Sequence, residues 1–187
     1  MPTSQWHGKS DAAADATSAG IGGWLSDQSE PTKDQVWWFM LPVSRTEHKW
    51  AFSKGKPQRL IAALELYGSL ILLKAIIQKA KSHIVNFRIP FATDNQGNAF
   101  NLLNSTTRSW PCSAILMELV TLTELSETCI APSHVKREGN TWADQLSNLD
   151  STGFDASRQL TCDALEDWSL LPELLELHSS EQEGTVP

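Results

Sequence analysis

Cysteine and tyrosine are scarce in this 187-residue chain, which contains three cysteines and one tyrosine. Cys112, Cys129 and Cys162 form no CxxC pair and no cysteine and histidine spacing of the kind that binds zinc. An odd number of thiols also argues against a disulfide framework. The pattern predicts reduced thiols in an intracellular protein, nuclear or cytoplasmic and not secreted.

Long uninterrupted apolar runs are also missing. The N-terminus has no apolar stretch of the signal-peptide kind, and the most apolar region, residues 60–77, is interrupted by Glu65 and Lys74. A membrane-spanning helix needs about 20 consecutive apolar residues. The sequence therefore predicts no membrane partner.

Positive charge is nearly absent from the C-terminal fifth of the chain. Residues 149–187 contain one arginine and nine acidic residues, whereas residues 1–148 contain 14 Lys/Arg and 13 Asp/Glu. The formal net charge of −7 is therefore a property of the tail, and it does not exclude phosphate contacts by the body. This shift predicts one domain over residues 1–148 and an acidic tail over 149–187, with one possible short helix at 169–177 and a disordered end.

The hydrophobic pattern predicts an α/β domain. Three strand-like segments precede a long apolar helix, and the remaining strands are separated by helices. We expect strands within residues 4–13, 20–27, 35–44, 84–94 and 129–136, and helices at 56–82, 95–104, 111–127 and 140–148. The order β-β-β-α-β-α-α-β-α indicates a mixed five-stranded sheet flanked by helices. Asn140 is expected to cap the last helix.

Four carboxylates stand at unusual places in this pattern. Glu65 lies in the most apolar helix with no Lys or Arg three or four positions away, so its charge needs a cation or a proton. Asp11 and Asp94 are expected at strand ends, and Asp144 lies in the last helix. Taken singly, each has an ordinary interpretation as a turn former, a cap or a solvated charge.

Taken together, the four acids favour a divalent metal site. Sites in mixed sheets gather at the C-terminal ends of strands, where Asp94 falls. Clustered carboxylates do not all ionise without a counter-ion, and Mg²⁺ prefers a few carboxylates together with water and phosphate oxygens. Two such ions activate water and stabilise the leaving oxygen in phosphodiester hydrolysis. We find no Ser/His/Asp or Cys/His arrangement that would support a nucleophilic mechanism.

A concentrated basic stretch lies between the third strand and the long helix, at residues 45–59. Trp50 and Phe52 are interspersed among its cations, and Glu47 is its single acid. One interpretation is a solvated loop; the other is a phosphate-contacting loop whose aromatic residues pack on sugars. The cations are Arg45, Lys49, Lys54, Lys56 and Arg59.

Four segments, SDAAADATSAGIGGWL, RLIAALELYGSL, FATDNQGNAFNLL and SHVKREGNTWADQLS, resemble the ribonuclease H domains of retroelement reverse transcriptases, in particular those of protists such as dinoflagellates. The resemblance covers residues 4–148. Its last segment matches the retroelement ending at His134, Asn140, Ala143, Asp144, Leu146 and Ser147. The short Ala-Asp and Leu-Ser helix favours ribonuclease H over the integrases, transposases and exonucleases of the same fold.

The resemblance implies a ribonuclease H-like fold and cleavage of the RNA strand of an RNA/DNA hybrid. It implies two Mg²⁺ ions, with Mn²⁺ as a substitute, at a catalytic and metal-binding set of Asp11, Glu65, Asp94 and Asp144. Asp15 remains an alternative to Asp11, because it fits the shorter spacing before the second strand that some relatives show. Hybrid contacts are expected from Asn95, Gln96, Lys49, Lys54, Lys56 and Arg59.

The resemblance also implies a reverse transcriptase polymerase domain as a partner, and we expect the domain to be a monomer. The loop histidine that assists product release in cellular ribonucleases H is missing from the short link before the last helix, which predicts slower turnover. His134 is expected to be structural. The alternative function is a catalytically silent ribonuclease H-like interaction or connection module.

Overall fold

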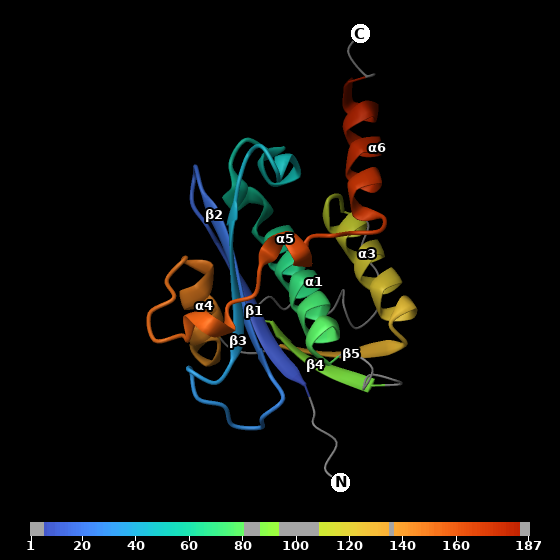
Figure 1. Cartoon of the computed structure of the whole chain (residues 1–187). Coiled ribbons are helices and arrows are strands. Elements are labelled where there is room, and N and C mark those ends of the chain that lie inside the picture. The colour runs from blue at the N-terminus through green and yellow to red at the C-terminus, as the bar shows by residue number, and fades with distance from the viewer. Residues whose placement is uncertain (1–5, 81–86, 94–108, 135–136, 184–187) are drawn as a thin grey trace.

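A mixed sheet of five strands forms the centre of the computed structural model, which describes residues 6–80, 87–93, 109–134 and 137–183 (Figure 1). The spatial order is β3-β2-β1-β4-β5. The first three strands pair in antiparallel fashion, whereas β4 is parallel to β1 and β5 is parallel to β4. The strands are β1 (His7–Ala14), β2 (Ala19–Ser26), β3 (Trp37–Val43), β4 (Phe87–Thr93) and β5 (Thr128–His134).

The helical elements are η1 (Lys49–Phe52), η2 (Pro57–Leu60), α1 (Ile61–Ala80), α3 (Cys112–Leu125), η4 (Arg137–Gly139), α4 (Thr141–Ser147), η5 (Ala156–Arg158), α5 (Cys162–Leu165) and α6 (Leu171–Glu183). The helices α1, α3 and α4 follow the predicted order, with bounds within a few residues of those expected; α6 extends six residues beyond the predicted tail helix, and α5 and the 3₁₀ helices (η) were not predicted. The helix expected at 95–104 lies outside the described residues.

Helix α1 is the centre of the hydrophobic core. It packs against β1, β2, β4 and α3, and it is apolar on most sides because it is enclosed on most sides. The segment Pro57–Ala80 is long and apolar enough to cross a membrane by length and composition, but 78% of its most apolar window is buried inside the protein. The apolar composition of this segment is thus explained by its burial in the protein core.

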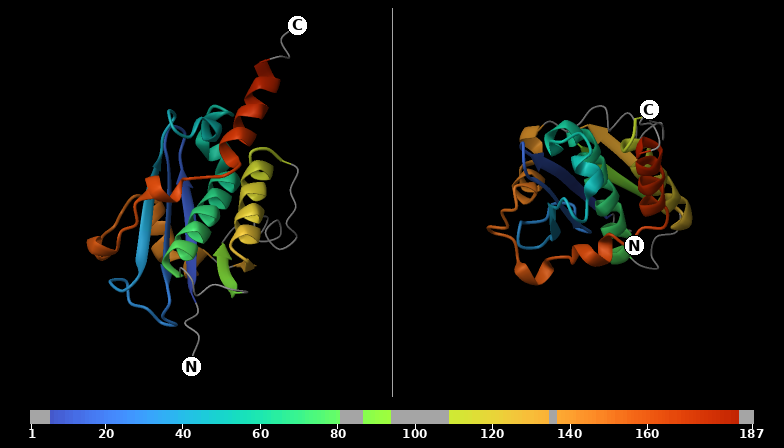
Figure 2. Two further views of the ribbon diagram at one scale, coloured as in Figure 1. Left: turned by 45° about the vertical axis from the view of Figure 1, so that its right-hand side comes forward. Right: turned by 90° about the horizontal axis from the view of Figure 1, so that it is seen from above.

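The helices form two layers, one on each face of the sheet (Figure 2). A Cβ atom added at Gly68 of α1 would lie 3.6 Å from Cβ of Ser10, so Ser10 faces α1. A Cβ atom added at Gly22 of β2 would collide with the backbone of Leu146 and Ser147, so Gly22 faces α4. Glycine in β2 therefore permits α4 to approach the sheet closely on the face opposite α1.

The C-terminal tail packs along the outer strand β3. The backbone N–H of Leu160 donates to the carbonyl of Trp38 at 2.8 Å, and Gln159 forms an isolated parallel bridge with Trp38. The thiol of Cys162 donates to the carbonyl of Met40 at 3.2 Å, and burial, followed by the charges of Glu166 and Asp163, raises the pKa of that thiol to about 12. The outer edge of the sheet is therefore partly covered by its own chain.

The start of α6 is fixed to α3 by one buried carboxylate. Glu118 accepts the backbone N–H groups of Ser169, Leu170 and Leu171 at 2.9, 2.6 and 2.8 Å. These are N–H groups at a helix N-terminus, where a negative charge is stabilising. Helix α6 continues to Glu183, so the disorder expected from residue 178 onward is wrong for residues 178–183.

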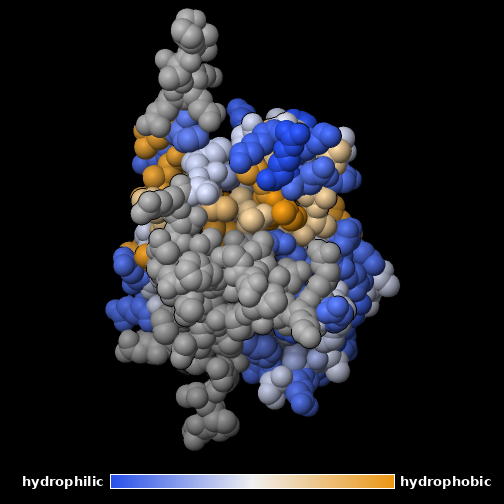
Figure 3. All heavy atoms as spheres, turned by 180° about the vertical axis from the view of Figure 1, so that it is seen from behind, coloured by the Kyte–Doolittle hydropathy of each residue, from blue (hydrophilic) through white to orange (hydrophobic). Residues whose placement is uncertain are grey.

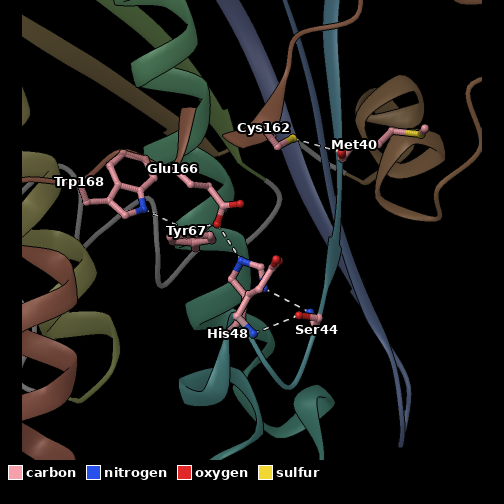
Figure 4. Close-up of polar contacts among 8 residues, drawn as sticks. Met40, Ser44, His48, Tyr67, Cys162, Glu166 and Trp168 are labelled. Carbon is pink, nitrogen blue, oxygen red and sulfur yellow. Dashed lines mark hydrogen bonds and ion pairs between the residues drawn. The ribbon is translucent and has the colours of Figure 1, made fainter. Parts of the chain in front are cut away.

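A second polar cluster holds the tail against the body (Figure 4). Glu166 accepts a hydrogen bond from the Tyr67 hydroxyl at 2.6 Å and lies 2.7 Å from Nε2 of the buried His48. The indole N–H of Trp168 donates to the Tyr67 hydroxyl at 3.0 Å. Burial raises the pKa of the Glu166 carboxyl, but hydrogen bonds from His48 and Tyr67 outweigh burial and lower it overall. Burial, followed by the charge of Glu166, raises the pKa of Tyr67.

Tail docking should therefore weaken in acid. Because the Glu166 carboxyl has a lower pKa in the folded protein than its ordinary value of 4.5, its stabilisation is present above that pH and is lost as the pH falls through the folded value. Urea unfolding at pH 7 should show Glu166→Gln to be less stable than wild type by about 1 kcal/mol. The difference should vanish at the acidic end of a pH series. The exposed neighbour Asp167→Asn is the control, and an equal pH dependence in both variants would contradict the assignment.

Gly22→Ala should displace α4. The new methyl group would meet the Leu146 and Ser147 backbone, and overpacking of this kind costs about 1 to 3 kcal/mol. Hydrogen exchange should show faster exchange of the α4 amides. Gly55→Ala is the control, since its Cβ would meet nothing within 4 Å and its cost comes from a φ of +84°. If the α4 amides of Gly22→Ala exchanged as slowly as those of the wild type, the sheet would accommodate the methyl group without displacement of the helix.

Candidate functional site

Asp11 occupies the middle of β1, with 1% of its surface exposed. It pairs across the antiparallel ladder with Gly22, and one carboxylate oxygen accepts the N–H of Ala12 at 2.8 Å. Because Gly22 faces α4 and directly paired residues share a face, Asp11 also lies on the α4 side of the sheet. Its expected position at a strand end is wrong, since β1 continues to Ala14 before the turn.

Asp15, the alternative first acid, is an exposed residue of the turn between β1 and β2. Its carboxylate accepts the backbone N–H groups of Thr17 and Ser18, both at 2.8 Å, and both hydroxyls. Hydrogen bonds from Thr17 and then Ser18 lower the pKa of the Asp15 carboxyl. This arrangement is the ordinary turn-closing role of aspartate, so the local geometry favours Asp11 as the site residue.

Glu65 lies in the second turn of α1, with 8% of its surface exposed. Helix α1 runs antiparallel to β1, because Gly68 contacts Ser10 whereas Leu72, one turn later, contacts Gly8. Glu65 lies about one turn before Gly68 in the helix. It is therefore level with the residues that follow Ser10, in the C-terminal half of β1. Glu65 thus lies level with the part of the strand that contains Asp11, on the face of the sheet opposite to the one on which Asp11 lies.

Asp144 is half-buried in α4, the helix that packs on β1, β2 and β3. Its neighbours Ala143 and Leu146 are fully buried and anchor the helix. The prediction that Asn140 caps α4 with its side chain is wrong. The Asn140 amide instead donates to the carbonyl of Ser10 at 3.2 Å, which ties the beginning of α4 to β1 one residue before Asp11.

Strand β1 is the element around which three of the four predicted acids are arranged. Asp11 belongs to it, and Glu65 and Asp144 are carried by the two helices that pack on it from opposite faces. Strand β4 pairs with β1 at Lys9 and ends at Thr93; Asp94 lies outside the described residues. Within the described ranges, no group of three or more acids, histidines or cysteines is close enough to hold a metal ion.

The donor set nevertheless fits magnesium in chemical type. Asp11 and Glu65 are buried carboxylates on adjacent elements, and Asp144 is a half-buried carboxylate on the third. Carboxylate oxygens are the protein ligands that Mg²⁺ prefers, and a magnesium site commonly leaves several positions to water and phosphate.

The basic segment presents cations but not aromatic faces. Lys49, Lys54, Lys56 and Arg59 are exposed, and no acidic side chain among the described residues forms an ion pair with them. Trp50 and Phe52 are 7% and 9% exposed and belong to the core, so the expected packing of these rings on sugars is wrong. In Figure 3 hydrophilic side chains gather at the end of the molecule that carries this segment in Figure 1. Asn95 and Gln96 lie outside the described residues.

A groove that was not predicted from the sequence lies on the same face of the sheet as Asp11. His7 and Lys9 of β1 line one wall, and Trp142 at the start of α4 lines the other. The period-two spacing of His7, Lys9 and Asp11 places all three on one face of the strand, and that periodicity was the signal available in the sequence.

Solved structures of ribonuclease H domains are similar to this chain. LC11-RNase H1 in complex with an RNA/DNA hybrid has a TM-score of 0.57 and 13% identity, covering 78% of this chain and 96% of that one. RNase H1 from the halophilic archaeon Halobacterium salinarum has a TM-score of 0.54 and 17% identity, covering 77% and 95%. The chain therefore has a ribonuclease H-like fold.

A retroviral relative of this fold belongs to a longer protein. The protease-reverse transcriptase of prototype foamy virus has a TM-score of 0.50 and 16% identity, and the match covers 81% of this chain and 22% of that one. No family model matches the sequence, and no curated protein matches it.

The two candidate first acids should separate in a metal-binding experiment. Asp11→Asn should weaken Mn²⁺ binding, followed by electron paramagnetic resonance, because a buried oxygen ligand loses its charge. Asp15→Asn should retain binding, since its carboxylate closes a turn at the surface. Circular dichroism of both variants controls for folding. If Mn²⁺ binding were lost in Asp15→Asn and retained in Asp11→Asn, Asp15 would be the metal ligand instead of Asp11.

Proposed function

We propose that this domain is a metal-dependent endonuclease that hydrolyses the RNA strand of RNA/DNA hybrids. The observation that carries the proposal is the placement of three acids around β1 within a ribonuclease H-like fold: the buried Asp11 on the strand itself, and the buried Glu65 and half-buried Asp144 on the two helices that pack against it. These acids come from three distant parts of the sequence, and the ordinary interpretations available for each one alone do not account for their placement around one strand.

Two Mg²⁺ ions, with Mn²⁺ as a substitute, would be held by Asp11, Glu65, Asp144 and Asp94. Bound there, they would supply an activated water and charge stabilisation for the leaving oxygen. Asp11 and Glu65 would be the rigid part of the site, because burial and core packing fix their backbones. Asp144 would be positioned by α4, whose beginning is tied to β1 through Asn140.

The exposed cations of residues 45–59 would bind the phosphate backbone of the hybrid. Lys49, Lys54, Lys56 and Arg59 supply donors without competing acids among the described residues. Contacts of this kind position the duplex without reading its sequence, and they make the affinity salt-dependent. Asn95 and Gln96 are proposed to contact the minor groove, which displays the 2′-hydroxyls.

A retroelement origin of the protist type is proposed on the sequence motifs, with the foamy virus similarity as support for an association with reverse transcriptase. The domain would act as a monomer next to a polymerase domain in such a protein. Ion pairing between the acidic tail and the basic segment is limited, among the described residues, to Glu166 with His48. The tail thus leaves the lysines of that segment available for phosphate.

Cleavage of a labelled RNA/DNA hybrid in Mg²⁺ or Mn²⁺ tests this function. The folded protein should cut the RNA strand and leave single-stranded RNA and duplex DNA intact. Asp94→Asn should reduce the rate by a thousandfold or more, since metal ions supply several kcal/mol of transition-state stabilisation. Asp167→Asn, the same change at an exposed aspartate outside the acid set and outside the groove, is the control. Binding of the hybrid without cleavage would favour the silent interaction module; near-normal cleavage by Asp94→Asn would remove Asp94 from the site.

A further inference from the structure

A groove of about 410 Å³ opens on the α4 face of the sheet. Lys9 and His7 of β1 form one side, Thr141 and Trp142 of α4 form the other, and Trp24 of β2 lies between them. The aromatic rings contact edge to face, with centroids 5.6 Å apart for His7 and Trp24 and 5.2 Å apart for Trp24 and Trp142. The volume is in the range of small-ligand sites in proteins.

The groove lies next to the proposed active site along β1, although Asp11, Glu65 and Asp144 do not line it. Lys9 precedes Asp11 by two positions on the same face of β1, a distance of about 7 Å along the strand. Asn140, which lines the groove, precedes Asp144 by four positions and donates to the carbonyl of Ser10. A polynucleotide whose scissile phosphate lies at the acids therefore has this groove directly beside it.

The groove offers the three kinds of contact that a nucleotide requires. Lys9 uses one N–H on the carbonyl of Gly139 at 2.8 Å and retains two donors for a phosphate. The half-buried rings of His7 and Trp142 offer apolar surface for a base or a sugar.

Asn140 supplies the third kind of contact. Its Oδ1 atom is buried and receives no hydrogen bond in the structure, and its residue is 1% exposed. Buried acceptors normally have a donor, so this atom has capacity for a hydroxyl or amino group of a ligand.

We propose that this groove binds one nucleotide adjacent to the scissile phosphate, with Lys9 at its phosphate and Trp142 against its base or sugar. The proposal rests on the hybrid nuclease function and adds a subsite to it. The nucleotide belongs to either the RNA or the DNA strand, and both offer the same phosphate, sugar and base chemistry.

Hybrid binding at several salt concentrations tests the role of Lys9. Measurements use the full chain with EDTA present, so that the strands remain intact. Lys9→Met keeps the apolar stem and removes the charge; it should weaken binding about fivefold and reduce the slope of log K against log salt by about one.

Lys74→Met is a matched control. Lys74 also donates to a backbone carbonyl, that of Asp167, at the same 2.8 Å, but it belongs to α1 and is not part of the groove. Its removal should leave the salt slope unchanged. Equal slopes for Lys9→Met and wild type would overturn the phosphate contact.

Photocrosslinking tests the aromatic wall without relying on activity. Hybrids with 5-iodouridine at single positions of the RNA strand, or 5-iododeoxyuridine in the DNA strand, are irradiated with the protein, and the attached peptides are identified by mass spectrometry. Attachment at Trp142 or His7 is expected from one strand, which identifies the source of the nucleotide. Attachment confined to residues 45–59, while the wild type still cleaves hybrid, would overturn the groove and leave the function standing. Absence of hybrid binding altogether would overturn both.

Discussion

The close approach of α4 to the sheet is the contact on which the rest of the candidate site depends. It is possible because β2 has glycine at the positions where side chains would meet the helix backbone. That approach brings Asp144 to the face on which Asp11 lies, and it allows the Asn140 amide to reach the β1 backbone. On the other face, α1 lies against the sheet with Gly68 close to Ile21 and Ser10, and this helix carries Glu65. Glycines at the contacts between helices and sheet thus influence where Asp144 and Glu65 lie.

The order and type of the elements could be predicted from sequence, because hydrophobic periodicity reports directly on burial. The long apolar helix is a clear case, since enclosure by the sheet, α3 and the tail leaves few positions for polar residues. The exceptional acid within it, Glu65, is buried as its apolar neighbours implied. The resemblance to ribonuclease H domains gave the fold that the solved structures share.

What sequence could not supply was the partner of each polar side chain. Asn140 stands where a cap is usual, yet it bonds across to β1, because tertiary contacts compete with local ones. Trp50 and Phe52 lie among lysines but face the core, since the short 3₁₀ turn Lys49–Phe52 packs against the body and buries three of its four residues. Spacing left Asp15 as an alternative to the preferred Asp11, and the structure places Asp11 within β1 and Asp15 in the turn that follows it. The tail contacts through Glu118 and Glu166 join residues about 50 to 120 positions apart, beyond the reach of any local pattern.

The tail along β3 also bears on how the protein behaves in solution. The outer strand has carbonyl groups at Trp38 and Met40 that are occupied by Leu160 and Cys162. An uncovered edge strand is a template for pairing with another chain. The tail residues that follow α4 therefore protect this edge against pairing with another chain, and a shortened chain that ends at residue 149 would expose the aromatic-rich strand β3 to its own copies.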